Sequence, residues 1–173
     1  MLYSIQGVEE PMLNRLIGSV RRNHALEHAT ISILMGRLGP DTRLVGRATS
    51  SGFYIYGNVP SEDIEISAEQ GLSRLQAGES VLAVSPLCGT NLAVAGVLAG
   101  LASTVSAGNR SRWERLPGVL LASMVAVLAA QPVGRWLQKH VTTSPDLRDV
   151  EIVGVRGSER PRGGFYKVET ARR

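Results

Sequence analysis

The first hydrophobic pattern in the chain is helical. Apolar residues recur at steps of three and four between positions 13 and 38, which is the spacing of one face of an α-helix. Three members of this stripe are polar, and since such a face is normally buried, we expect them to point inward. A buried carboxylate and two imidazoles need a metal ion or a closed hydrogen-bond network. The stripe consists of Leu13, Leu16, Ile17, Val20, His24, Glu27, His28, Ile31, Leu34 and Leu38.

Alternating patterns farther along the chain predict strands of a small mixed sheet. A second helical pattern begins at Ser61 and has Ile64, Ala68, Leu72 and Leu75 on its buried side. The combination predicts an α+β fold. The predicted strands are residues 43–49, 53–58, 81–84, 150–155 and 165–170.

Two further segments are too apolar for an ordinary soluble domain. Residues 92–107 and 117–134 contain no charged side chain. Each is shorter than the roughly 20 residues of a bilayer span, but each can extend into its flanks. We therefore expect a transmembrane helical hairpin inserted into the α+β fold, with a buried helical pair in a soluble core as the alternative. Close approach of its helices is predicted from Gly96 and Gly100 on the first and from Ala122, Ala126 and Ala130 on the second.

These patterns predict three parts along the chain. Residues 1–87 carry the first helix and part of the sheet, residues 88–140 form the hairpin, and residues 141–173 complete the sheet. The first ten residues show no basic segment followed by an apolar run, and the chain has one cysteine, which suits a reducing compartment. We expect an integral protein of the cell membrane with its termini and α+β part in the cytoplasm, although the arginines of residues 109–116 favour the opposite orientation.

Charge gives the expected partners. The formal net charge is +4, and no block of Lys and Arg interleaved with aromatic residues appears. This pattern excludes nucleic acid as an expected partner and leaves membrane lipid. Homo-oligomerisation is left open.

The spacing of the polar trio suggests a specific chemistry. His24 and His28 stand at i and i+4 of a helix, so both imidazoles can converge on one ion, and Glu27 can reach a water bound to that ion. The alternative is a helix whose histidines are satisfied by hydrogen bonds. This H-x-x-E-H arrangement resembles the inverzincins, the pitrilysin-type zinc peptidases, and the resemblance implies zinc bound by the two histidines with Glu27 as general base.

The resemblance covers roughly residues 20–80, where the order of helix, strands and helix is similar to the metal-binding half of such a peptidase. It then departs, because the window in which that family carries its third ligand, a glutamate, falls in the apolar hairpin. Cys88 is the substitute that the sequence offers. It lies at the mouth of the first apolar helix, where a helix N-terminus favours the thiolate. The alternative role for Cys88 is that of a small buried apolar residue.

Two sequence motifs together suggest a second resemblance. Residues 23–30 read NHALEHAT and residues 88–91 read CGTN. The pair resembles a family of small prokaryotic membrane proteins of unknown function, over residues 12–138. This resemblance implies no activity, only that the two motifs occur together, as a shared site would require.

Two functions are therefore predicted from different classes. The first is a membrane-anchored zinc hydrolase acting on a peptide or protein. In it, Thr90 or Asn91 either donates to the oxyanion or caps the helix, and Tyr54 and Tyr56 line the cleft. An exposed strand edge near the metal would take an extended peptide. The second is a non-catalytic complex subunit or assembly factor with a structural metal site, favoured by the shortness of the chain.

Overall fold

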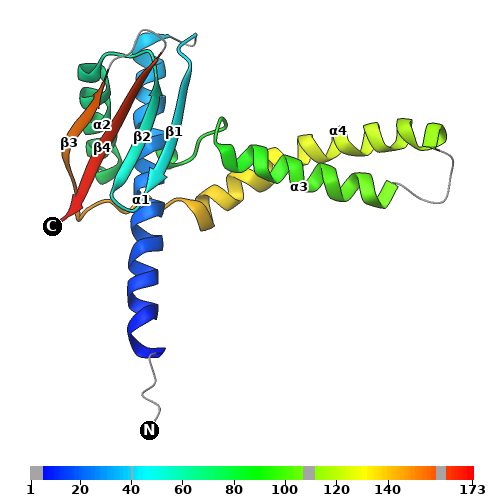
Figure 1. Cartoon of the computed structure of the whole chain (residues 1–173), viewed down its shortest axis with the longest axis horizontal. Helices are drawn as coiled ribbons and strands as arrows, with labels where there is room; N and C mark the ends of the chain where they lie inside the picture. Colours follow the sequence, from blue (N-terminus) through cyan, green and yellow to red (C-terminus); the bar gives the residue numbers. More distant parts are fainter. Residues whose placement is uncertain (1–5, 40, 107–111, 159–162) are drawn as a thin grey trace. The chain divides into compact units, whose positions relative to one another are not determined.

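The structure, a computed structural model, describes residues 6–39, 41–106, 112–158 and 163–173. The chain forms two compact units (Figure 1). Unit 1 comprises Met1–Val84 and Val141–Arg173, and unit 2 comprises Ser85–His140. Unit 1 contains α1 (Gln6–Leu38), β1 (Leu44–Thr49), β2 (Gly52–Gly57), α2 (Ser61–Gln76), η1 (Ser80–Ala83), β3 (Val150–Ser158) and β4 (Gly164–Arg172).

The strands of unit 1 form one sheet in the order β1-β2-β4-β3, in which every pairing is antiparallel. The α+β class is thus confirmed, but the expectation of a mixed sheet is wrong. The strand predicted at residues 81–84 is also wrong, because this segment forms the 3-10 turn η1. The segment is short, Val81 is exposed, and the proline after Ser85 prevents its extension.

Helices α1 and α2 cover the same face of the sheet (Figure 1). Phe53 and Ile55 point from β2 into the core against them, and Tyr166 and Val168 do so from β4. The helices approach closely at Gly71 of α2, because a side chain there would press on Ala29 of α1. The predicted buried side of α2 is confirmed, with Leu72 half-buried and the other three residues fully covered.

The apolar stripe of α1 is buried only in its central part. Of the stripe, Glu27, His28 and Leu34 are buried and His24 and Ile31 half-buried. Ala25, Leu26 and Ala29, which lie outside the stripe, are fully buried as well, because the sheet and α2 cover this part of the helix. The prediction is wrong for Leu38, which is 40% exposed at the end of the helix, and for the first two turns of the stripe, where the helix extends past the sheet (Figure 1). The exposed residues there are Leu13, Leu16, Ile17 and Val20, with exposed fractions of 58, 52, 48 and 37%.

Unit 2 consists of α3 (Gly89–Ser106) and α4 (Arg112–Leu137), which run back along each other, and α4 continues into the π-helical turn η2 (Gln138–Thr142). Among the residues that the structure describes, one helical stretch, Leu116–Thr142, is long and apolar enough to cross a membrane, and Gly89–Val105 is a shorter apolar helix. The basic loop expected at residues 109–116 lies partly outside the described residues. Exposed apolar side chains of the unit include Leu92, Val97, Leu101, Leu120, Leu121, Met124, Val125, Leu128 and Trp136.

The contact between α3 and α4 uses a different stripe of α3 from the predicted one. Ala126 and Ala130 are buried as expected, but Gly96 and Gly100 lie on the exposed side of α3, where an added methyl group would contact no neighbouring residue within 4 Å. The Ser103 hydroxyl instead meets the Ser123 hydroxyl at 3.1 Å. The two glycines are therefore not the approach points between these helices.

We expect the protein to remain in the membrane pellet after alkaline carbonate washing. The physical reason is the apolar surface of α3 and α4, which water would solvate poorly and lipid would cover. Immunoblotting of pellet and supernatant measures the outcome. Release of the chain into the supernatant would contradict integration of the helices and favour a peripheral or soluble form.

Candidate metal centre

His24 and His28 lie one turn apart on α1, and their ring centroids are 4.4 Å apart with the planes tilted by 59°. His28 is buried and His24 half-buried. The helix is held in this position by Asn23, whose amide donates to the Thr49 carbonyl at 2.8 Å and accepts from the Thr170 hydroxyl at 2.8 Å. Hydrogen bonds to the ends of β1 and β4 thus hold α1 in place at Asn23, immediately before the histidine pair.

Each histidine hydrogen bonds to the last carbonyl of a short helix. His28 Nδ1 lies 2.9 Å from the Ala83 carbonyl oxygen, at the end of η1, and His24 Nδ1 lies 3.0 Å from that of Thr142, at the end of η2. The last carbonyls of a helix have no partner within it and carry partial negative charge. The two rings therefore cap two helix ends.

These bonds define the tautomer that each ring has when it is neutral. A carbonyl oxygen can only accept, so Nδ1 of each ring carries the proton and donates it. In a neutral imidazole the other nitrogen, Nε2, is then unprotonated. This is the arrangement in which metal-binding histidines are usually held, with one ring nitrogen fixed by a carbonyl and the other presented to the ion.

Glu27 lies between the histidines on the helix, only 6% exposed, with its carboxylate against Gly46 of β1. A methyl group at position 46 would overlap Oε1, so the absence of a side chain there makes the space for the carboxylate. Since β1 is an edge strand, Glu27 sits beside the open edge of the sheet. The inward direction predicted for Glu27 is confirmed.

Cys88 belongs to unit 2, where it is buried and immediately precedes α3. The Thr90 backbone N–H donates to Cys88 Sγ at 3.4 Å. An N–H donor and the positive end of a helix both favour the thiolate over the thiol. Burial of the side chain acts in the opposite direction, so the thiolate at Cys88 stays a prediction.

The other predicted residues have different surroundings. Both amide hydrogens of Asn91 are used within unit 2, on the carbonyls of Ser85 (3.4 Å) and Pro86 (2.8 Å). Since an amide has two donors, Asn91 could serve an oxyanion only by breaking one of these bonds. Thr90 contributes its backbone N–H to Cys88.

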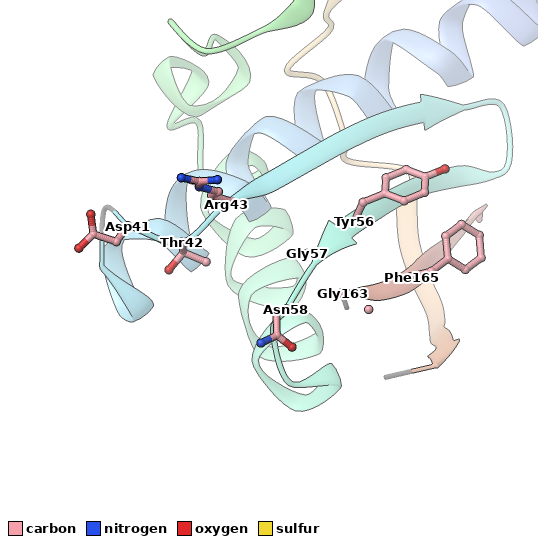
Figure 2. A pocket seen from close by; sticks show the side chains of 9 residues that line it. Asp41, Thr42, Arg43, Tyr56, Gly57, Asn58, Gly163 and Phe165 are labelled. Atoms are coloured by element: carbon pink, nitrogen blue, oxygen red, sulfur yellow. The ribbon is translucent and has the colours of Figure 1, made fainter. Parts of the chain in front are cut away.

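Tyr54 lies on the face of the sheet that the helices leave uncovered. Its ring stacks on Phe165 at 5.3 Å, and Tyr56 also contacts Phe165 at 5.3 Å. Glu27 and the histidine pair are on the opposite face, so the structure does not bring Tyr54 to them. Tyr56 and Phe165 line a separate open cavity of about 1080 Å³ at the end of the sheet, with Asp41, Thr42, Arg43, Gly57, Asn58, Gly163 and Gly164 (Figure 2).

Comparison with known proteins identifies the family. A family model described as a domain of unknown function (DUF6391) matches residues 19–155. The chain belongs to this family. An uncharacterized protein of Picosynechococcus sp. (strain ATCC 27264 / PCC 7002 / PR-6) is 33% identical over 138 residues, which is 74% of this chain and 67% of the relative. No solved structure matches the chain significantly.

Sequence reasoning missed three parts of this centre. Gly46 was detectable in principle, because a lone glycine inside a strand pattern often marks close approach of another group. Gln138 is fully buried and bonds to Asn91 and to the Ser85 backbone N–H. It was detectable as an uncharged polar residue four positions after Gly134, on the same helix side as the small residues. The carbonyls of Ala83 and Thr142 had no sequence signal, because any residue supplies a backbone carbonyl.

Proposed function

We propose that this protein is a membrane-anchored, zinc-dependent hydrolase that cleaves peptide bonds. In this proposal His24, His28 and Cys88 bind the zinc ion and Glu27 is the general base. The observation that carries it is the pair of backbone-fixed imidazoles, each with Nδ1 donating to a carbonyl. These hydrogen bonds satisfy one nitrogen of each ring, so the shared orientation of the rings, and not the cost of burying them, supports a metal site.

The donor set suits zinc. Neutral imidazole nitrogen and thiolate sulfur are its common protein ligands, and three protein ligands leave one position open, as a catalytic site requires. The chain connectivity also favours Cys88 as the third ligand. It follows Ala83, which is bonded to His28, by five residues, and five residues span at most about 18 Å.

When bound, zinc would supply a Lewis acid that polarises the carbonyl group and lowers the pKa of water. The Glu27 carboxylate would accept the proton that the attacking water loses, and later donate it to the leaving amine. Its position beside the edge strand β1 suits a substrate in extended form, because such a peptide can pair with the unpaired backbone groups of that edge.

The membrane anchor of the proposal is the helical hairpin. Helix α4 with η2 supplies the candidate span, and we propose that α3 accompanies it in the bilayer. Two helices packed by small residues and a serine pair, with apolar side chains outward, are typical of membrane packing. The orientation with unit 1 in the cytoplasm stays a prediction.

A second candidate function is a structural metal site in a non-catalytic membrane subunit or assembly factor. The observation that favours it is the burial of Glu27, which is only 6% exposed and so has little room for a substrate beside it. The two candidates differ in the fourth metal position. A catalytic site keeps it open for water, and a structural site fills it with a side chain.

We expect the protein purified without chelators to carry about one zinc ion per chain. The reason is the fixed Nε2 orientation of both histidines together with the N–H donor at Cys88 Sγ. Elemental analysis measures the metal, and circular dichroism checks the fold. A folded preparation that neither contains zinc nor takes it up would rule out both candidate functions.

A further inference from the structure

Unit 2 contains a buried side-chain amide at the end of its second helix. Gln138, the first residue of η2, is fully buried. Its Nε2 donates to Asn91 Oδ1 at 2.9 Å, and its Oε1 accepts from the Ser85 backbone N–H at 2.8 Å. Gln138 therefore joins the end of α4 both to the first turn of α3 and to the loop before it.

Asn91 continues this network into the loop that contains Cys88. Its amide binds the carbonyls of Ser85 and Pro86, and its backbone N–H donates to the Cys88 carbonyl at 2.9 Å. The Cys88 N–H in turn donates to the Ser85 carbonyl at 3.3 Å. The Cys88 carbonyl is thus bonded to Asn91, and the Cys88 N–H is bonded to Ser85, a residue that Asn91 and Gln138 also bind.

Helix α4 has small residues where these two amides pack. Gly134 faces Asn91 so closely that a side chain at position 134 would overlap Asn91 Oδ1. Ala126, Ala130, Gly134 and Gln138 follow one another at steps of four, so the small residues of α4 end at a buried amide. A buried amide in an apolar hairpin is costly without hydrogen bonds. Here the two amides bond to each other, Gln138 also bonds to one backbone group, and Asn91 bonds to two backbone carbonyls through its side chain.

We propose that Asn91 and Gln138 are positioning residues, which hold the Cys88 loop so that the thiolate is presented in one fixed place for the metal. This proposal rests on the proposed function for its metal, but the fixing of the loop can be tested without any metal. An apolar contact at position 138 would join the helices equally well. Only the amide gives Ser85 an acceptor and Asn91 a donor at the same time.

The first experiment uses the fact that Cys88 is the only cysteine of the chain. In the metal-free full-length protein in lipid nanodiscs, the rate of maleimide labelling then reports on this loop alone. Gln138→Met keeps the length of the side chain but removes both hydrogen bonds, and we expect it to raise the labelling rate about tenfold or more. Gln138→Glu keeps the acceptor for Ser85 and should fall between Gln138→Met and the wild type.

The matched control is Ser103→Ala, which removes a hydrogen bond between the same two helices at their other end. We expect its labelling rate to stay within about twofold of the wild type, because the Cys88 loop keeps its own bonds. An unchanged rate in Gln138→Met would overturn the proposal. An equal increase in Ser103→Ala would also overturn it, since the effect would then be general loosening of the hairpin.

The second experiment asks whether the fixed loop matters to the metal. Cobalt(II) replaces zinc, and its thiolate charge-transfer absorption reports coordination by Cys88. We expect Gln138→Met to weaken zinc binding about tenfold and to diminish this band, with partial rescue in Gln138→Glu. Faster labelling with unchanged metal affinity and absorption would overturn the positioning role. A wild type that binds no metal would refute the proposed function, while the labelling rates would still decide whether the amides fix the loop.

Discussion

Replacing Glu27 with glutamine is expected to lower the rate of peptide hydrolysis by a factor of about 10² to 10⁴ while zinc stays bound. The amide is nearly isosteric with the carboxylate and is not a proposed ligand, so the buried space beside Gly46 still accommodates it. What is lost is the group that accepts the proton. Zinc content and cleavage of a peptide library, measured on the same preparations, give the two quantities.

The comparison that makes this result specific is with two ligand variants. His28→Ala should lose the metal, and Cys88→Ser should weaken its binding, because a hydroxyl is a far poorer zinc ligand than a thiolate. If Glu27→Gln cleaves at the wild-type rate, or loses its zinc as readily as His28→Ala, the mechanism fails as stated. A wild type that holds zinc and cleaves no member of a broad library would favour the structural metal site.

The second large effect is expected at Gly46, a residue that performs no chemistry itself. Gly46→Ala places a methyl group where Glu27 Oε1 lies, so the carboxylate must move although its identity is unchanged. A displacement of about 1 Å at a reacting group can reduce the rate about 10²-fold. We therefore expect hydrolysis to fall by about that factor with zinc content preserved, in the same two assays.

Gly154→Ala provides the matched control. It makes the same substitution in β3 of the same sheet, and no atom beyond the two chain neighbours lies within 4 Å of the added methyl group. Its activity should equal that of the wild type within about twofold, because ordinary surface substitutions change little. If Gly46→Ala also keeps full activity, the position of the Glu27 carboxylate does not limit the reaction.

Local patterns predicted the elements of unit 1 well, because they depend on neighbours in the chain. The β1–β2 hairpin lies within a residue or so of the predicted strands, and the predicted histidine stripe falls within one helix, α1. The spacing of apolar residues could not show how much of α1 the sheet would cover. Leu13 and Leu16 have the same spacing as Leu34, but the sheet ends before it reaches them.

The sequence predicted the residue types of the candidate site but not the groups that hydrogen bond to the two histidines. The spacing of His24 and His28 implied convergent rings, which the structure shows. The partners that orient those rings are backbone carbonyls about 55 and 118 positions away in the chain, and no residue identity marks them. Gly96 and Gly100 were predicted as the contact points between α3 and α4 but are not. A small-residue motif predicts that another helix can approach closely, but it does not show which neighbour will lie against it.

The histidine caps have a consequence for the two segments of unit 1 that connect it to unit 2. Ala83 and Thr142 each lie one residue inside the points at which the chain leaves and re-enters unit 1, and both are bonded to imidazoles of one helix. If those imidazoles bind an ion, the order of these two segments and the metal occupancy are thermodynamically linked, and the linkage is reciprocal. A change that strains either segment would then lower the metal affinity by the same factor by which the bound metal disfavours that change.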